Sequence, residues 1–342
     1  MKITVNTSDL ASLDRFAAEH PKATAGHRAV WPSILQQGLG HQPYSLTAWR
    51  DGQVVGYLPL VMTKSMIFGR HLVSLPYVNE AGVLTDELET TRNLIYRTIE
   101  MSHKLRVRRV ELRNRMPYAS SNLSPIRTDK VRMLLPLASD HDGLWSQIGS
   151  KPRNLIRKAE KNDLKVQFGG SELLNAFYHV FSINMRDLGT PVFSKQFFGA
   201  ILHHMKRDAE LCVVWQDHQP IAAALLTHQG ETTEVPSASA LRAYNHTSCN
   251  MILYWHLLQR AQARGAKVFD FGRSSVDSGT YRFKKQWGAM PYPTGWQQYA
   301  PGTGAKPITP ETDQMQLAVK VWQKLPVWLT RLAGPQIIKG IP

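Results

Sequence analysis

The sequence predicts an α/β protein made of two mixed lobes of comparable size. Helical and strand-like hydrophobic patterns alternate along the chain. Both halves follow the order helices, hairpin, strand, long helix, strand and return strand, although they share no visible sequence identity. A chain of 342 residues, 43% of them hydrophobic, is long for one core and suits two. We expect a first lobe at 1–138, a second at 139–300, and a linker with a basic amphipathic helix at 301–342.

The first half is organised around a predicted hairpin. Asp51-Gly52 stands between two strand-like runs, and this pair is a strong short-range signal of a tight turn. Ser8 occupies the N-cap position of an amphipathic segment. The expected elements are helices at 8–20, 31–38 and 86–104 and strands at 44–49, 54–62, 71–77, 107–113 and 131–137.

The second half contains a second hairpin, across Asp217 to Pro220, and a long helix that Gly265 ends. Ser171 and Ser194 are placed as N-caps. The expected elements are helices at 141–148, 151–162, 171–187, 194–205 and 250–264 and strands at 164–168, 210–216, 221–228, 232–240 and 267–271.

Basic residues outnumber acidic ones, with 41 Lys and Arg against 26 Asp and Glu and a formal net charge of +15. This surplus biases encounters toward polyanions, which include nucleic acid, an anionic membrane face and phosphorylated substrates. The sign of the charge does not choose among these three classes.

Two cysteines, Cys212 and Cys249, stand without a CxxC motif or a nearby His pair, so neither a disulfide framework nor a metal site is indicated. The N-terminal segment turns polar early and lacks a signal-peptide core. The longest strongly apolar run, 221–226, is too short to cross a bilayer. We therefore expect a cytoplasmic protein. The absence of GxSxG, GxxxxGK[ST] and HxxxH sets aside serine hydrolases, P-loop NTPases and zincins.

The segment 267–280 joins a short buried strand to a polar loop. The strand 267–271 fixes the backbone, and the loop that follows holds glycines together with Arg273 and Ser274. Because glycines let the chain turn tightly against a ligand, polar side chains in such a loop can be aimed at it.

The next segment, 281–288, alternates aromatic and cationic residues. In a strand, this alternation places Tyr281 and Phe283 on one face and Lys284 on the other. The cationic face either meets an anion or is the solvated side of an edge strand.

Arg153, Arg157 and Lys161 share one face of a predicted helix through their spacing of four residues. They form either a contact for a polyanion or a solvated helix face. Near the end of another helix, Arg186 either forms a surface pair with Asp187 or contacts a substrate.

The loop between strand 232–240 and the long helix could bind phosphate, because amides at a helix N-terminus are exposed. It carries Arg242, Tyr244 and Asn245 but no glycine, and a pyrophosphate cradle usually needs one. The segment 312–338 is amphipathic and basic, so it either lies in a membrane interface or packs as a Pro-kinked helix.

With these residues laid out, the C-terminal half resembles the FemAB family, specifically the FemAB-related proteins of exosortase (PEP-CTERM) and exopolysaccharide systems. The resemblance covers most of residues 150–335, and in the N-terminal half it rests mainly on element order and LPYVNEAG. The matching stretches are RNLIRKAEKNDLKV, FSINMRDLGTPVFSKQFF, NMILYWHLLQRAQARGAKVFDFGRSSVDSGTYRFKKQWGA and, more loosely, WQKLPVWLTRLAGP.

The resemblance implies tandem acetyltransferase-like (GNAT) lobes and the transfer of an acyl or aminoacyl group to an amine. Characterised family members take the aminoacyl group from a charged tRNA and place it on a peptidoglycan precursor. The family's aromatic-lysine element falls on Phe283 and Lys284. The glycine-bearing pyrophosphate loop of CoA-dependent enzymes is missing at 242–250, which is a departure from those relatives.

On this basis we expect Lys284 to stabilise the oxyanion or an adjacent phosphate, and Asp270 or Tyr281 to take the amine's proton. The expected substrate contacts are Arg273, Ser274, Phe283, Arg242, Tyr244, Asn245 and Arg186, and the expected tRNA contacts are Arg153, Arg157 and Lys161.

The expected donor is aminoacyl-tRNA or acyl-CoA, with no tightly bound cofactor and no metal. The expected acceptor is an anionic, envelope-related or lipid-linked amine. Two alternatives are a CoA-dependent N-acetyltransferase and a non-catalytic adaptor that docks on the inner membrane through 312–338.

Overall fold

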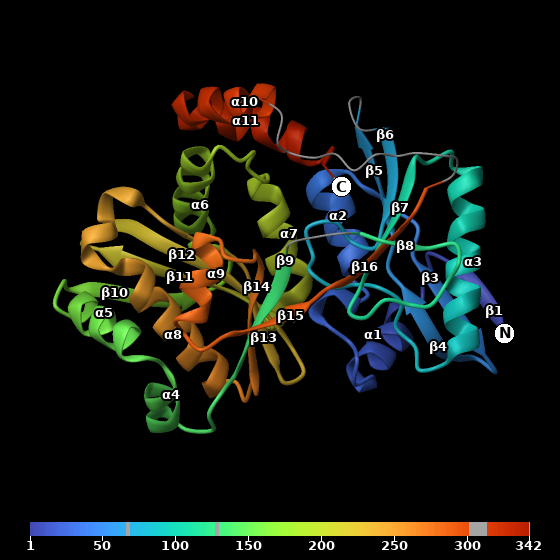
Figure 1. The fold of residues 1–342 in the computed structure, drawn as a ribbon, viewed down its shortest axis with the longest axis horizontal. Coiled ribbons are helices and arrows are strands. Elements are labelled where there is room, and N and C mark those ends of the chain that lie inside the picture. Colours follow the sequence, from blue (N-terminus) through green and yellow to red (C-terminus); the bar gives the residue numbers. More distant parts are fainter. Residues whose placement is uncertain (66–68, 127–129, 301–312, 342) are drawn as a thin grey trace. The chain divides into compact units, whose positions relative to one another are not determined.

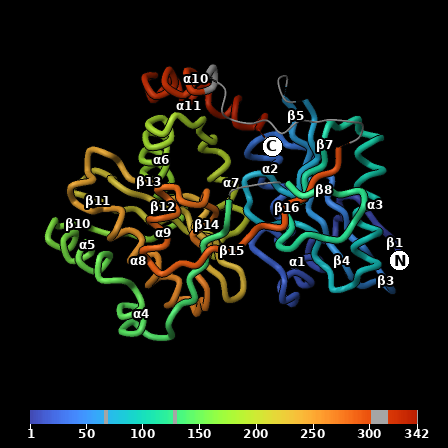
Figure 2. Tube along the Cα trace, viewed as in Figure 1, coloured from blue at the N-terminus to red at the C-terminus, as the bar shows by residue number. Residues whose placement is uncertain are grey.

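The computed structural model describes residues 1–65, 69–126, 130–300 and 313–341 (Figure 1). It divides into two compact units, which Figure 2 follows along the chain. The first unit contains 1–127, 294–310 and 335–342, and the second contains 128–293 and 311–334. Neither unit is one continuous segment, which differs from the predicted bounds at residues 138 and 300.

The second unit is built on a seven-stranded sheet. Its only parallel neighbours among the described strands are β13 and β14, because α8 (Cys249–Ala263) carries the chain back between them. The strand order is β10 (Leu164–Gly169), β11 (Ala209–Gln216), β12 (Gln219–Gln229), β13 (Thr232–Ala240), β14 (Val268–Ser275), β9 (Lys130–Pro136), β15 (Met290–Pro293).

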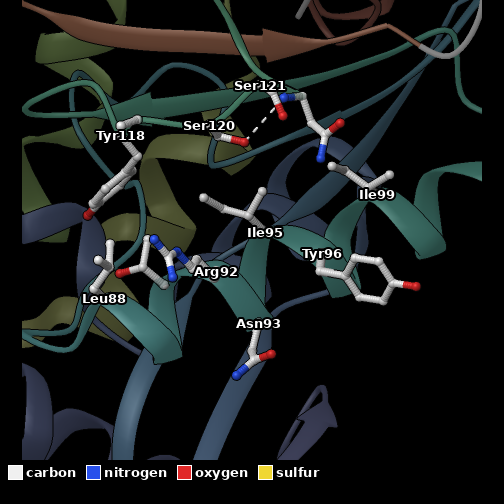
Figure 3. Close-up of a pocket in the computed structure, with 12 residues that line it drawn as sticks. Leu88, Arg92, Asn93, Ile95, Tyr96, Ile99, Tyr118, Ser120 and Ser121 are labelled. Atoms are coloured by element: carbon white, nitrogen blue, oxygen red, sulfur yellow. Dashed lines mark hydrogen bonds between the residues drawn. The ribbon is translucent and has the colours of Figure 1, made fainter.

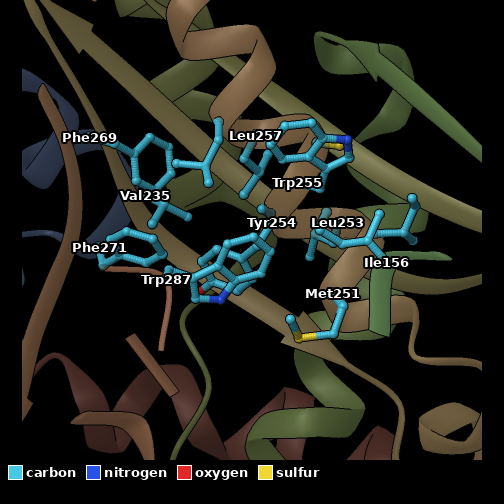
Figure 4. Packing of buried hydrophobic residues seen from close by; sticks show 14 of the residues in the cluster. Ile156, Val235, Met251, Leu253, Tyr254, Trp255, Leu257, Phe269, Phe271 and Trp287 are labelled. Carbon is cyan, nitrogen blue, oxygen red and sulfur yellow. The ribbon is translucent and has the colours of Figure 1, made fainter. Parts of the chain in front are cut away.

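Helices cover both faces of this sheet. α6 (Leu174–Leu188) and α7 (Lys195–Met205) contact it on one side, and α8 contacts it on the other, with α5 (Ser150–Glu160) packed against α8. On the α8 side, alternate strand residues such as Cys212 and Val214 belong to one fully buried cluster with Leu253 and Leu257. Figure 4 shows the two leucines within this cluster. This core holds α8 in place and thereby fixes the strands at either end of it.

The first unit repeats the same motif. Strands β6 and β7 are parallel and joined through α3 (Leu88–Lys104), so β6–α3–β7 matches β13–α8–β14. Its six-stranded sheet runs β2 (Gln42–Pro43), β5 (Val61–Ser65), β6 (Gly69–Val73), β7 (Arg109–Asn114), β16 (Gly295–Tyr299), β8 (Ser124–Pro125). A three-stranded sheet of β1 (Lys2–Val5), β3 (Leu46–Arg50) and β4 (Gln53–Leu58) lies beside α1 (Leu10–Glu19) and α2 (Trp31–Leu39). The prediction of two mixed α/β lobes is confirmed.

Several local predictions hold and others need correction. The hairpin at Asp51-Gly52 is confirmed, with φ of 50° and 78° at its two central residues. The predicted strand 54–62 is two strands, because Pro59 falls between β4 and β5. The N-cap of α1 is Asp9 rather than Ser8, since the Asp9 carboxylate accepts the amide N–H of Ser12. Ser194 caps α7 as expected.

The main correction concerns residues 281–288. They were expected to alternate as a strand, but Gly279–Lys285 form the helix α9, which begins where the Ser278 hydroxyl accepts the amide N–H of Tyr281 at 3.1 Å. In a helix, residues three apart share a face, so Tyr281 and Lys284 are buried together. The preceding loop is also shorter than expected, because β14 continues through Ser275.

The C-terminal segment forms α10 (Asp313–Lys324) and α11 (Val327–Ile338), which meet at Pro326. It packs on α6, where the Arg331 guanidinium donates to the Ser182 hydroxyl at 2.9 Å and the Gln323 amide donates to the Asp187 carbonyl at 3.1 Å. Packing on the body is therefore confirmed for one side of these helices. Within the described parts of the chain, every helix is too short or too polar to span a membrane.

Candidate functional site

The parallel strands β13 and β14 separate partway along their length. Three register pairs join them, the last being Glu234 opposite Asp270. Beyond this pair, β13 continues beside β12 only, and β14 continues beside β9 only. Two strand edges with main-chain N–H and C=O groups therefore face each other without a ladder between them, which is an arrangement able to receive an amide-bearing ligand.

Two β-bulges stand at the point of separation. In β13, Val235 and Pro236 lie opposite the single residue Leu226 of β12. In β14, Phe271 and Gly272 lie opposite the single residue Met133 of β9, and Gly272 has a φ of 73°, which favours glycine. Because a bulge bends its strand, two bulges at the same level part the strands.

The side chain of Lys284 in α9 is hydrogen-bonded to the bulge of β14. Its ammonium donates to the main-chain oxygens of Gly272 at 3.2 Å and Arg273 at 3.0 Å, and the residue is only 8% exposed. Burial lowers the pKa of Lys284 to about 8, with Arg273 adding to the effect and the carboxylates of Asp270 and Glu234 opposing it. An ammonium has three N–H donors, so a third one is left for a ligand.

Asp270 has a structural set of partners. One carboxylate oxygen accepts the Arg132 guanidinium at 3.0 and 2.5 Å, and the other accepts the amide N–H of Gly272 at 2.8 Å. Both side chains are buried. Asp270 was expected near the end of a strand, but β14 continues for five residues beyond it. Its guanidinium partner is Arg132.

Three other predicted residues lie on the same two elements. The Ser274 hydroxyl is buried and has no hydrogen-bond partner among the described residues, which is uncommon for a native polar group. Tyr281 is buried, and the Lys285 ammonium lies 5.9 Å from its ring centroid. Phe283 is half-buried against Tyr254, with their ring centroids 5.0 Å apart.

The remaining predicted substrate contacts gather elsewhere in the second unit. Arg186 pairs with the Asp187 carboxylate at 2.6 Å and donates to the Leu325 carbonyl at 3.1 Å, so its surface-pair interpretation holds. Arg242 donates to the Asp187 carbonyl at 3.0 Å. Tyr244 packs against the core, whereas Asn245 is exposed on the same short turn.

The three predicted polyanion contacts are on α5 and at its C-terminal end. Arg153 is half-buried, and Lys161 is exposed. The Arg157 guanidinium lies 5.4 Å above the ring of Trp145, so this residue has an aromatic neighbour and is more than a solvated charge.

Glu234 is a site residue that sequence reasoning missed. It forms the last register pair with Asp270, and its charge acts on Lys284. The sequence carried a signal two residues further on. Pro236 has no main-chain N–H to donate within the predicted strand 232–240, and proline in a sheet marks an edge or a bulge.

A separate pocket of about 450 Å³ lies in the first unit between α3 and residues 118–122 (Figure 3). Its lining includes Arg92, Tyr96 and Tyr118, and the main-chain N–H of Asn122 donates to the Ser120 hydroxyl at 3.3 Å. None of the predicted site residues lines it.

Comparison with known proteins identifies the fold. A model of the acetyltransferase (GNAT) domain matches residues 150–285, which include β13, α8, β14 and α9. No curated protein sequence matches the chain.

Solved structures extend the similarity to nearly the whole chain. FemX superposes with a TM-score of 0.71 at 15% identity, covering 95% of this chain and 100% of that one. L-PGS from Bacillus licheniformis gives a TM-score of 0.58 at 11% identity, covering 93% and 98%. A tandem GNAT protein from the clavulanic acid biosynthesis pathway gives 0.55 at 10% identity, covering 89% and 99%. The chain therefore has the fold of two tandem GNAT-like lobes.

Proposed function

We propose that this protein is an acyltransferase that moves an activated acyl or aminoacyl group onto an amine, with the reaction at the separation of β13 and β14. The observation that carries the proposal is the buried ammonium of Lys284, held by two main-chain oxygens of the β14 bulge. The GNAT-domain match over residues 150–285 supports the same reaction class.

The reaction needs a fixed positive charge beside the acyl carbonyl. The amine nitrogen attacks the carbonyl carbon, a C–N bond forms, and the carbonyl oxygen becomes negative until the bond to the leaving oxygen or sulfur breaks. The remaining N–H of Lys284 donates to that oxygen, and the ammonium needs little reorganisation because its other donors are already bound.

The amine also loses a proton. Glu234 and Tyr281 are the candidates to receive it and pass it to the leaving group, since the charge of Glu234 acts on Lys284 and Tyr281 shares the buried face of α9 with it. Asp270 instead holds Arg132 and the Gly272 amide, so its role is to position the bulge.

The finer assignment concerns donor and acceptor. The donor is an aminoacyl-tRNA or an acyl-CoA, and the acceptor is an amine of an envelope-related or exopolysaccharide-related precursor. The net charge of +15 supports an anionic partner on either side of the reaction.

The outer side of α10 and α11 supports a peripheral contact with an anionic membrane surface. Leu317, Val321, Trp328 and Leu332 are 54–70% exposed there, and Lys320 and Lys324 are exposed on the same segment. Exposed apolar side chains with interspersed lysines match the chemistry of an interfacial helix. This surface also favours the second candidate function, a non-catalytic adaptor at the membrane.

Donor breakdown tests the enzyme without knowledge of the acceptor. The full-length protein is incubated separately with radiolabelled acetyl-CoA and with tRNA charged with radiolabelled amino acids, and water or added hydroxylamine serves as acceptor. We expect faster deacylation of one donor class than in a protein-free control. If neither donor is deacylated faster and the protein still binds vesicles, the acyltransferase proposal is refuted and the adaptor function is favoured.

A further inference from the structure

The second unit has another hollow, of about 480 Å³, between α4 (His141–Gln147), α5 and α8. Its volume is in the range of small-molecule sites. None of its lining residues belongs to β13, β14 or α9, so the hollow is separate from the proposed reaction centre. The chemistry described so far leaves it without a role.

Two indole rings and a guanidinium form one wall of this hollow. The rings of Trp145 and Trp255 lie 5.0 Å apart at 64°, and the Arg157 guanidinium lies 5.4 Å above Trp145. Trp255 is buried and thus fixed, whereas Trp145 is half-buried and keeps part of its surface toward the hollow. Aromatic and guanidinium planes together favour a flat heteroaromatic ring.

The lining also includes polar groups that can form hydrogen bonds with the edge of such a ring. Gln259 and His141 are hydrogen-bonded at 3.0 Å, and His256 is half-buried on the same helix as Gln259. Burial lowers the pKa of His256, so at neutral pH its ring offers one donor and one acceptor nitrogen. Glu160 and Asp142 add carboxylate acceptors for amino groups.

Two further basic residues flank Arg157 on α5 and at its C-terminal end. Arg153 and Lys161 each stand four residues from Arg157, a rise of about 6 Å along a helix. Phosphates attached to a ring in the hollow would therefore meet positive charge on either side of Arg157. The carboxylates of Glu160 and Asp142 disfavour a phosphate inside the hollow itself, which separates the places for ring and phosphate.

We propose that this hollow binds a nucleotide: the base stacks on Trp145 and Arg157, and the phosphates lie against Arg153 and Lys161. The inference rests on the proposed function, because a nucleotide is the part that the two donor classes share. It occurs as the single-stranded end of a charged RNA and as the phosphorylated adenosine of a CoA thioester.

Binding is measured on the full-length protein by calorimetry with three probes: the RNA tetranucleotide ACCA, free coenzyme A, and ribose 5-phosphate as the base-free control. We expect one of the first two probes to bind and ribose 5-phosphate not to bind. Binding of the RNA alone assigns the hollow to an RNA donor, and binding of coenzyme A alone assigns it to a thioester.

Variants locate the binding. Trp145→Ala should lower the affinity for the probe about 5- to 150-fold, as loss of one stacking partner does. Trp145→Phe should keep most of the affinity. Arg157→Gln should weaken it and reduce its salt dependence. Tyr292→Ala, at an exposed aromatic residue on β15, is the control and should bind like the wild type.

The proposal is overturned if neither nucleotide binds, if ribose 5-phosphate binds equally well, or if Trp145→Ala and Arg157→Gln both bind like the wild type while circular dichroism shows them folded. The acyltransferase proposal is tested independently by donor deacylation. A protein that binds nucleotide here yet deacylates no donor would refute the enzyme and leave the nucleotide site standing.

Discussion

The Nζ atom of Lys284 lies 3.0 Å from the main-chain oxygen of Arg273, so the residue assigned to the chemistry also joins α9 to the bulge in β14. One side chain thus joins the helix to the strand and, in the proposed reaction, supplies the positive charge. Experiments on Lys284 must separate these two roles, and its exposed neighbour Lys285 offers a matched comparison.

Replacing Lys284 with Met should reduce donor deacylation by about 100- to 1,000-fold, as the loss of one oxyanion donor does. Lys285→Met changes the same helix and the same residue type at an exposed position, and it should keep near wild-type turnover. The measurement is the initial rate with whichever donor class the wild type deacylates, after circular dichroism has shown that both variants are folded. Most of the activity surviving in Lys284→Met would refute the proposed role.

The pH dependence of the rate should follow the deprotonation of the Lys284 ammonium. Burial lowers the pKa of Lys284 to about 8, so the charged form needed beside the oxyanion is lost above that pH. We expect the rate to fall about tenfold per pH unit on the alkaline side, and this fall should be absent in Lys284→Met. A rate that instead rises through pH 8 would mean that the neutral amine acts as a base.

Stability should depend on pH in the opposite direction. The pKa of Lys284 is about 8 in the folded protein against 10.5 for an ordinary lysine, so between these values the unfolded chain binds more protons. The free energy of unfolding contributed by this residue therefore rises with pH across that window, by about 3 kcal/mol in total. The free energy of unfolding is measured by urea titration at about pH 7.5 and about pH 10 for the wild type and Lys284→Met. The rise between these two pH values should be smaller in the variant.

Asp270→Asn should destabilise the second unit. The change removes the negative charge that pairs with the buried Arg132 guanidinium, and breaking a buried ion pair in this way typically costs about 3–5 kcal/mol. Asp277→Asn, at an exposed position in the next turn, should have little effect. The double change Asp270→Leu with Arg132→Met should recover part of the loss in thermal unfolding, and an unchanged midpoint in Asp270→Asn would show that the ion pair contributes nothing.

Membrane contact should depend on the outer side of α10 and α11. We expect the protein to cosediment with vesicles containing phosphatidylglycerol and to remain in solution with pure phosphatidylcholine. Trp328→Ser with Leu332→Ser should weaken this binding strongly, because both side chains are more than 60% exposed. Equal binding by the double variant would assign the attraction to the protein's general positive charge.

Local patterns predicted most elements but could not predict which strands meet. The hairpin at Asp51-Gly52 and the capped helix after Ser194 follow from nearby residues alone. Strand β9 was assigned to the first lobe by its place in the chain, yet it pairs with β14 and β15 in the second. Such pairing depends on partners more than 100 residues away, and a period of two or 3.6 carries no such information.

The candidate site was only partly visible in the sequence. Lys284 was singled out by a resemblance, whereas Glu234 and Arg132 were found only through strand pairing and the ion pair with Asp270. The wrong assignment of 281–288 as a strand arose because aromatic and cationic residues alternate there, while the hydroxyl of Ser278 caps a helix. An N-cap hydrogen bond spans three residues and can start a helix even where side chains alternate with the two-residue period of a strand.

Strand β16 lies between β7 and β8, although nearly the whole chain separates it from the start of the first unit. During synthesis, the N-terminal sheet therefore waits with the edge of β7 open until residue 299 has left the ribosome. An open edge can pair with other chains, so nascent protein would be vulnerable to aggregation throughout this interval. Fragments that stop near residue 127 should consequently be insoluble, and adding a peptide of residues 290–300 during refolding should rescue them.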